Sequence, residues 1–170
     1  MSPILSSPVL SPRRGLAGFT LIEVFIVTVV LALLYSFIIL AIKPDEIKAR
    51  ARDVVRVSDV NKIYAAVEAY IADTGAPPEP AGLTRTSLIL VGAGPLARSN
   101  GQGWLGSDLS KYLEKLPLDP TNKNAYFYRY RHIGAKYEVD ALLEYYSDEA
   151  GGDGGNSATR YEKGTDLTII

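Results

Sequence analysis

The longest regular pattern in the chain is an apolar run from Phe19 to Ile42, in which Glu23 is the only charged residue. At the rise of an α-helix this run is about 36 Å long, which exceeds the roughly 30 Å hydrocarbon core of a bilayer. The pattern therefore predicts a membrane-spanning helix over residues 19–43. A carboxylate at the centre of such a helix costs about 2.5–3.5 kcal/mol, and less near an end, so Glu23 requires a partner or a function.

After Pro44 the pattern becomes amphipathic. Apolar residues recur at steps of three and four, which predicts one buried stripe along a helix: Ile47, Ala51, Val54, Val55, Ile63, Tyr64, Val67, Tyr70 and Ile71. The opposite face carries charges at helical pairing distances, namely Glu46, Arg50, Arg56, Asp59 and Lys62. We expect one long helix from about Thr20 to Asp73, bent near Pro44 and stopped by Gly75, with residues 44–74 as its second half.

Residues 75–170 are long enough for one small outer domain. Proline and glycine break any regular element between Pro77 and Gly106. Within this connecting stretch, Leu88–Val91 is expected to be a short apolar insert and Trp104 a packing anchor. A short helix is predicted from Ser107, as its N-cap, to Lys115.

From Tyr126 onward the period changes to two, which is typical of strands. Two alternating runs flank a glycine turn near His132–Gly134 and predict an antiparallel hairpin, with His132 a solvated turn residue. The core face would carry Tyr126, Tyr128, Tyr130, Tyr137, Val139, Ala141 and Leu143. On the other face, Arg129 and Arg131 would pair with Glu138 and Asp140. A third strand is predicted over Gly164–Ile170. The expected class is α+β, with a long amino-terminal helix packed on a small antiparallel sheet.

The residues before the apolar run form a short basic leader, Ser11-Pro12-Arg13-Arg14-Gly15-Leu16-Ala17-Gly18, followed at once by Phe19-Thr20-Leu21-Ile22-Glu23. This arrangement resembles the leader and cleavage site of the type IV pilin and type II secretion pseudopilin superfamily. The resemblance implies a pilin-like fold and cleavage between Gly18 and Phe19, which removes residues 1–18 and keeps the apolar helix. An ordinary secretory signal differs, because its cleavage discards the apolar segment.

The same resemblance implies roles for individual residues. Phe19 would be N-methylated as the new amino terminus, and Glu23 would pair with the terminal amine of a neighbouring subunit during assembly. The alternative is that Glu23 only complements the dipole of the first helical turn. Arg13 and Arg14 would hold the amino terminus in the cytoplasm as positive-inside residues.

A second, weaker resemblance concerns the outer domain. The run Pro117-Leu118-Asp119-Pro120 before an aromatic hairpin resembles the region before the sheet of major pseudopilins. The acidic, glycine-rich segment Ser147–Ser157 resembles their calcium loop in composition and position, which implies a Ca²⁺ site with Asp148, Asp153 and Asn156 as ligands. A flexible acidic surface loop is the alternative, and both remain open.

Composition narrows the functional classes. The chain has no cysteine and one histidine, which excludes a thiol nucleophile and a cysteine–histidine zinc site, and no catalytic set emerges, so we expect no enzyme. The net charge of −1 does not suggest a nucleic-acid binder, and the tyrosines and arginines of the hairpin are accounted for by a core face and ion pairs. Many major pilins close a loop with a disulfide, so a cysteine-free chain is closer to pseudopilins or to disulfide-free pilins.

Together with the resemblance, these features predict a structural subunit of a type IV pilus-like filament. The resemblance implies copies of itself, prepilin peptidase, an assembly platform protein and an ATPase motor as partners. It would be anchored once in the cytoplasmic membrane, with its carboxy-terminal domain outside, and then enter an extracellular or periplasmic filament. The first alternative is a pseudopilin of a type II secretion piston. The second is a monomeric single-span binding protein, which would need neither cleavage at Gly18 nor Glu23.

Overall fold

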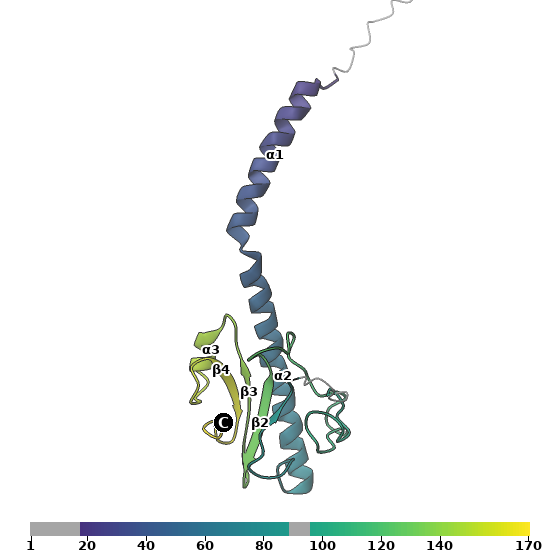
Figure 1. Cartoon of the computed structure of the whole chain (residues 1–170), viewed down its shortest axis with the longest axis vertical. Helices are drawn as coiled ribbons and strands as arrows, with labels where there is room; N and C mark the ends of the chain where they lie inside the picture. The colour runs from purple at the N-terminus through teal and green to yellow at the C-terminus, as the bar shows by residue number, and fades with distance from the viewer. Residues whose placement is uncertain (1–17, 89–95) are drawn as a thin grey trace, which may run out of the picture. The chain divides into compact units, whose positions relative to one another are not determined.

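The computed structural model describes residues 18–88 and 96–170, so Arg13, Arg14 and most of the predicted insert Leu88–Val91 lie outside the described residues. The chain divides into two units, one ending at Lys43 and one spanning Pro44–Ile170. Each unit is described by itself. The elements are α1 (Leu21–Ile42), α2 (Pro44–Thr74), β1 (Arg85–Thr86), β2 (Tyr128–Ile133), β3 (Lys136–Leu142), α3 (Ser147–Gly151) and β4 (Arg160–Gly164) (Figure 1).

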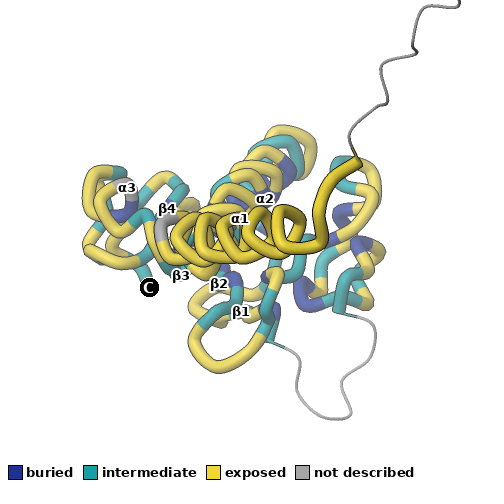
Figure 2. Tube along the Cα trace, turned by 90° about the horizontal axis from the view of Figure 1, so that it is seen from above, coloured by how far each residue is buried: buried dark blue, intermediate teal, exposed yellow. Residues whose placement is uncertain are grey.

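The first unit contains α1, which confirms the predicted apolar helix. Within it, Leu21–Leu40 has a mean hydropathy of 2.6 and is the one helix among the described residues long and apolar enough to cross a membrane. Its described side chains are exposed along its whole length, as the yellow tube of α1 in Figure 2 shows. The hydroxyls of Thr28 and Ser36 donate to backbone carbonyls one turn back, at 2.8 and 3.0 Å. Those polar groups are therefore satisfied inside the helix.

The predicted single long helix is interrupted at one residue. Lys43 caps α1 in the left-handed conformation, with φ of 46°, and α2 begins at Pro44. Proline lacks an N–H donor and disfavours the helical conformation in the residue before it, so the break falls where the sequence placed only a bend. The end of α2 is as predicted, because Gly75 has a φ of 80° and its N–H donates to the carbonyl of Ile71 at 2.8 Å.

The second unit contains a four-stranded antiparallel sheet in the order β1-β2-β3-β4. The predicted hairpin is confirmed as β2 and β3, joined at Gly134, whose φ is 60°. The strand predicted over Gly164–Ile170 is wrong in position, since β4 ends at Gly164. Beyond it, Asp166 accepts from the backbone and hydroxyl of Thr168 and closes a local turn instead of extending the strand. The two-residue strand β1 has no counterpart in the sequence predictions.

The core lies between α2 and one face of the sheet, because α2 packs against β3 and β4. It comprises Val60, Ile63 and Val67 of α2, the sheet residues Tyr128, Tyr130, Tyr137, Val139 and Ala141, and Trp104, Leu105, Leu109 and Leu116 from the connecting segment. Those sheet residues were predicted to share one face and do so. Trp104 is a packing anchor as expected: it is 4% exposed, and its indole N–H donates to the carbonyl of Pro117 at 3.1 Å.

Two local predictions in this unit are wrong. The short helix from Ser107 to Lys115 does not form beyond a single turn at Leu109–Leu113, because the Ser107 hydroxyl accepts from the N–H of Glu79 at 2.9 Å instead of capping a helix. His132 is buried at 6% exposure and not solvated, since its Nε2 lies 2.7 Å from the carbonyl oxygen of Glu79. In both cases the competing partner is Glu79, which is far away in the sequence.

The buried stripe of α2 begins later than predicted. Ile47, Val54 and Val55 are 53%, 60% and 43% exposed, whereas the buried apolar residues start at Val60. In the same first half of the helix, Asp53, Arg56 and Asp59 are buried, although Arg56 and Asp59 were expected on the charged outer face. The first half of α2 thus buries charged side chains and exposes apolar ones.

Candidate functional site

The amino-terminal segment places the predicted processing and assembly residues at the start of α1. Thr20 is the N-cap, and its hydroxyl accepts from the backbone N–H of Glu23 at 3.3 Å. Glu23 therefore lies in the first turn of the helix, and Phe19 directly before the cap is 81% exposed. Phe19 and Glu23 line a shallow apolar groove with Val24, Val27 and Thr28. The two residues that the sequence links to assembly thus share one exposed site.

Gly18 has no structural reason to be glycine. A Cβ atom added there would meet nothing within 4 Å, and its φ lies outside the left-handed range that favours glycine. This contrasts with Gly103 and Gly164, where an added Cβ would come within 1.9 and 2.1 Å of backbone oxygens. Neither packing nor backbone conformation within the described residues demands glycine before Phe19.

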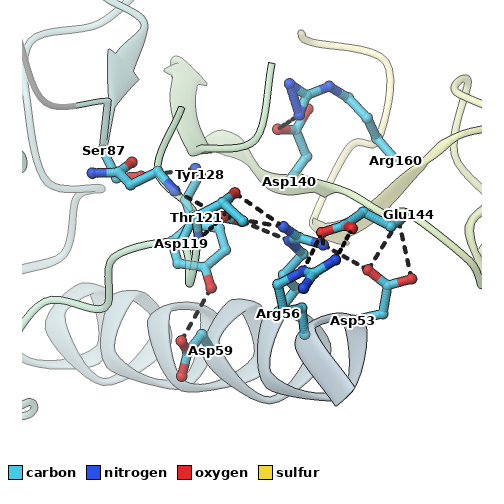
Figure 3. A network of polar contacts seen from close by, with 12 residues as sticks. Asp53, Arg56, Asp59, Ser87, Asp119, Thr121, Tyr128, Asp140, Glu144 and Arg160 are labelled. Carbon is cyan, nitrogen blue, oxygen red and sulfur yellow. Dashed lines mark hydrogen bonds and ion pairs between the residues drawn. The ribbon is translucent and has the colours of Figure 1, made fainter. Parts of the chain in front are cut away.

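The second unit contains a buried ion network centred on Arg56, which the sequence predictions missed (Figure 3). Arg56 is fully buried and binds Asp119 through two nitrogens, Nε to Oδ2 at 2.6 Å and Nη2 to Oδ1 at 3.1 Å. Its Nη1 also lies 2.8 Å from Asp53 Oδ1 and 2.6 Å from Glu144 Oε1. The network therefore joins α2, the predicted proline–aspartate–proline run and the segment after β3.

Asp53 fixes the segment that leads into α3. Its carboxylate accepts from the backbone N–H groups of three successive residues, Glu144, Tyr145 and Tyr146, at 2.7–3.1 Å. Asp53 acts like an N-cap residue, because its carboxylate accepts from backbone N–H groups just before a helix. Unlike an ordinary N-cap, Asp53 belongs to a different helix, α2. The start of the acidic loop is thus held against α2.

Two carboxylates of this network, Asp119 and Glu144, have lowered pKa values. Burial by itself would raise the pKa of Asp119, but the bonds from Arg56 and Thr121 outweigh burial and hold that pKa below its ordinary value. The guanidinium of Arg52 likewise lowers the pKa of Glu144, with Arg56 adding to the effect. The same bonds raise the pKa of Arg56 despite the cost of its burial. The network is therefore a set of mutually compensated charges.

These shifts predict a loss of stability in acid. A carboxyl group whose pKa is lower in the folded state adds stability above its unfolded pKa, about 3.8 for Asp119, and loses that stability as the pH falls through the folded value. Asp119→Asn should therefore be less stable than the parent at pH 7 and flatten the decline of unfolding free energy below about pH 4. Urea unfolding of the full chain in detergent at pH 7, 4 and 3 measures this. An unchanged slope in the variant would show that Asp119 does not titrate in this way.

The three predicted calcium ligands lie at different places: Asp148 in α3, and Asp153 and Asn156 between α3 and β4. Asp148 is exposed in α3 and Asn156 is exposed further along the chain. Asp153 is half-buried and already accepts two backbone bonds, from Gly155 N–H at 2.9 Å and Glu162 N–H at 2.5 Å. A site that uses all three side chains stays a prediction, and no contact among the described residues brings the three together.

The structure instead gathers carboxylates on the strands. Glu138 and Asp140 of β3 and Glu162 of β4 are fully buried, and each offers an oxygen within 4.8 Å of the others. They lie on the sheet face opposite the core, which we call the charged face, with Arg129, Arg131 and Arg160. Of the predicted cross-strand pairs, Arg129–Asp140 is confirmed, with Nε 2.9 Å from both carboxylate oxygens. Arg131 lies opposite Glu138 in register but donates from Nη1 to the carbonyl of Ile169 at 3.4 Å.

Alternation predicts the part of this face that Arg129, Arg131, Glu138 and Asp140 form, whereas Glu162 of β4 was not predicted on it. Alternation does not predict that this face is buried, because the residues that cover it come from elsewhere in the chain. Glu138 Oε2 accepts from the backbone N–H groups of Ile169 and Ile170 at 2.8 and 2.9 Å. The sequence predicts a third strand where this covering tail lies.

Comparison with known proteins agrees with the leader motif and the fold. The chain is 31% identical over 130 residues to the type II secretion system core protein G of Pseudomonas aeruginosa, covering 75% of this chain and 82% of that protein. It is 28% identical to the protein of the same name from Vibrio cholerae, over 83% of this chain and 88% of that one. No protein-family model matches the chain, and no solved structure does. With its apolar helix and small antiparallel sheet, the chain belongs to the type II secretion core protein G family, the pseudopilins of the type IV pilin superfamily.

Proposed function

We propose that this chain is the pseudopilin subunit of a type II secretion filament, the first of the alternatives drawn from its sequence. The observation that carries the proposal is the 31% identity to a type II secretion core protein over three quarters of the chain. The absence of cysteine agrees with it, because many surface pilins close a loop with a disulfide. The protein would act mechanically and carry no enzymatic activity.

The exposed surface of α1 supports assembly through this helix. Apart from Glu23, its surface is apolar all round, and its large apolar side chains are exposed in the first unit, so in a filament they would pack against identical helices in place of lipid. Glu23 would pair with the amine of Phe19 on a neighbouring subunit, which compensates a carboxylate that is costly inside the bilayer. The exposed Ile47, Val54 and Val55 of α2 offer further apolar surface for neighbouring copies.

The proposed partners follow from the processing and assembly of the subunit. Prepilin peptidase would remove residues 1–18, and a platform protein with its ATPase motor would extract the subunit from the cytoplasmic membrane into a periplasmic filament. Arg13 and Arg14 would orient the helix before cleavage, with the second unit outside the cytoplasm.

Gly18→Leu should leave the leader attached and block assembly, because the peptidase would read the residue before the cut and Gly18 has no packing role that would confuse the result. Intact-mass analysis should show the parent chain beginning at a methylated Phe19 and the variant retaining Met1. Ser11→Leu places the same side chain in the leader away from the junction and should be processed normally. Filament-borne parent subunits that still carry residues 1–18 would contradict the processing role.

Deletion of the gene in its host separates a secretion filament from a surface pilus. If the chain forms a secretion piston, exported proteins should accumulate in the periplasm and return to the medium when the gene is restored. Undiminished secretion combined with loss of surface fibres by electron microscopy would instead support a pilus. Undiminished secretion with no change in surface fibres would support the remaining alternative, a monomeric single-span binding protein.

A further inference from the structure

The covering tail, residues 165–170, is held on the charged face of the sheet mainly by one carboxylate. The backbone N–H groups of Ile169 and Ile170 both donate to Glu138 Oε2, at 2.8 and 2.9 Å. Both isoleucines are half-buried, whereas Glu138 is fully buried beneath them. The tail therefore occupies the hydrogen-bonding position that a charged partner of Glu138 would otherwise take.

Such a partner lies on the neighbouring strand. Arg131 of β2 is directly opposite Glu138 of β3 in the antiparallel register. Opposite charges at facing positions ordinarily pair, because their Cβ atoms are about 4.5–5.5 Å apart. Arg131 donates to the tail instead, from Nη1 to the carbonyl oxygen of Ile169 at 3.4 Å, which is long for a hydrogen bond. The cross-strand pair is thus replaced by contacts of both side chains with the tail.

This replacement leaves one polar atom of each side chain unsatisfied. Arg131 Nε and Glu138 Oε1 are buried and have no hydrogen-bond partner among the described residues. A buried polar atom without a partner costs free energy, and the cost is larger for a charged group. Burial also raises the pKa of Glu138, although the two N–H groups of the tail oppose that rise. Both charges are therefore incompletely compensated while the tail is in place.

The same groups have a second arrangement. If the tail lifts away, the guanidinium of Arg131 can bind both oxygens of Glu138 across the strands, which satisfies Nε and Oε1 together. The two arrangements exclude each other, because the tail and Arg131 compete for the same carboxylate. Opening the tail loses its hydrogen bonds to Glu138 but gains the cross-strand ion pair. Competition of this kind gives a segment two discrete states.

We propose that residues 165–170 form a reversible strap, and that its open state is supported by an Arg131–Glu138 ion pair which the closed strap prevents. Opening would be local, because the apolar core between α2 and the sheet lies on the opposite face and stays packed. The open strap would expose the charged face together with the apolar side chains of Ile169 and Ile170. The strap does not depend on the proposed role in secretion.

Hydrogen exchange of the Ile169 and Ile170 amides tests the strap, measured by NMR on the full chain in detergent. Exchange of these amides reports how often the strap opens. Arg131→Met removes the ion pair that only the open state forms, so exchange of both amides should slow at least threefold. If Arg131 served only to hold the strap through its bond to Ile169, its loss would make exchange faster. The two roles of Arg131 therefore predict opposite results.

Lys136→Met is the matched control. Lys136 Nζ lies 2.8 Å from Asp166 Oδ2 and so stabilises the closed strap, and its loss should speed exchange about twofold, as for an exposed ion pair. Two lost cations would then act in opposite directions. The amide of Val139 in β3 reports unfolding of the whole sheet and establishes that each variant is folded.

Unchanged or faster exchange in folded Arg131→Met would overturn the proposal. If that variant does not fold, Arg131→Lys takes its place, since lysine keeps the charge but cannot bind both oxygens of Glu138 through a planar fork. Slower exchange than in the parent would support the strap. Exchange as fast as in the parent, or faster, would show that Arg131 contributes nothing to an open state.

Discussion

Glu23→Val should abolish filament assembly and leave membrane insertion intact or improved. The substitution removes the only charged side chain of the apolar run, and with it the proposed attraction to the amine of a neighbouring Phe19. Insertion scales put the cost of a carboxylate at about 2.5–3.5 kcal/mol at the centre of a membrane helix and at less near an end, where Glu23 lies, so its removal still favours the membrane-bound monomer. Cleaved subunits should accumulate in the membrane, as measured by fractionation, while sheared or overexpressed filaments disappear from electron micrographs.

A matched control lies five residues further along the same helix. Thr28→Val removes a hydroxyl that is already satisfied by the carbonyl of Phe25, so it changes shape little and removes no charge. Filaments should form normally in this variant. If Glu23→Val polymerised as well as Thr28→Val, the pairing role would be wrong, and an interaction with the dipole of the first turn would explain Glu23.

Arg56→Met should cause the largest loss of stability in the second unit. It leaves the buried carboxylates of Asp53 and Asp119 without their cation, and breaking a buried ion pair in this way costs about 3–5 kcal/mol. Urea unfolding of the full chain in detergent, followed by tyrosine and tryptophan fluorescence, measures the change. Lys48→Met is the control, because Lys48 pairs with Asp45 at 3.9 Å on the exposed side of α2 and should change little.

A second variant separates lost charge compensation from lost packing. Replacing Asp119 as well, in Arg56→Met with Asp119→Leu, removes one of the stranded carboxylates and should recover part of the stability. A double variant less stable than the single one by the full cost of Asp119→Leu alone would show that the two residues act independently. That outcome would reject the network as an energetic unit.

Local pattern was sufficient where neighbours along the chain decide the structure. The apolar run predicts α1 because a helix of that length needs no partner from elsewhere in the chain to be recognised. Gly75 ends α2 as expected, and the period of two places Tyr128, Tyr130 and Tyr137 on the core face. The break at Lys43 also follows from its neighbour Pro44, although its left-handed conformation was not anticipated.

Errors arose where a side chain has its partner far away in the sequence. Arg56 has the helical spacing of a solvated charge, yet Asp119 lies 63 residues later and binds it inside the protein. Ser107 has the properties of an N-cap, but its hydroxyl accepts a hydrogen bond from the backbone N–H of Glu79 instead. Such competition is decided by which segments the fold brings together, and no local window contains both partners.

The sequence by itself determined the apolar helix, the position of Glu23 in its first turn and the antiparallel hairpin, because each depends on contiguous residues or a regular period. The processing junction at Gly18 and Phe19 stays a prediction from the sequence. The tertiary structure alone decided which charges are buried. It put Arg56 among three carboxylates, and it covered Glu138 and Glu162 with a tail and a loop that the sequence assigned to other roles. Burial sets the energetic consequence of a charge, and burial depends on distant segments meeting in space.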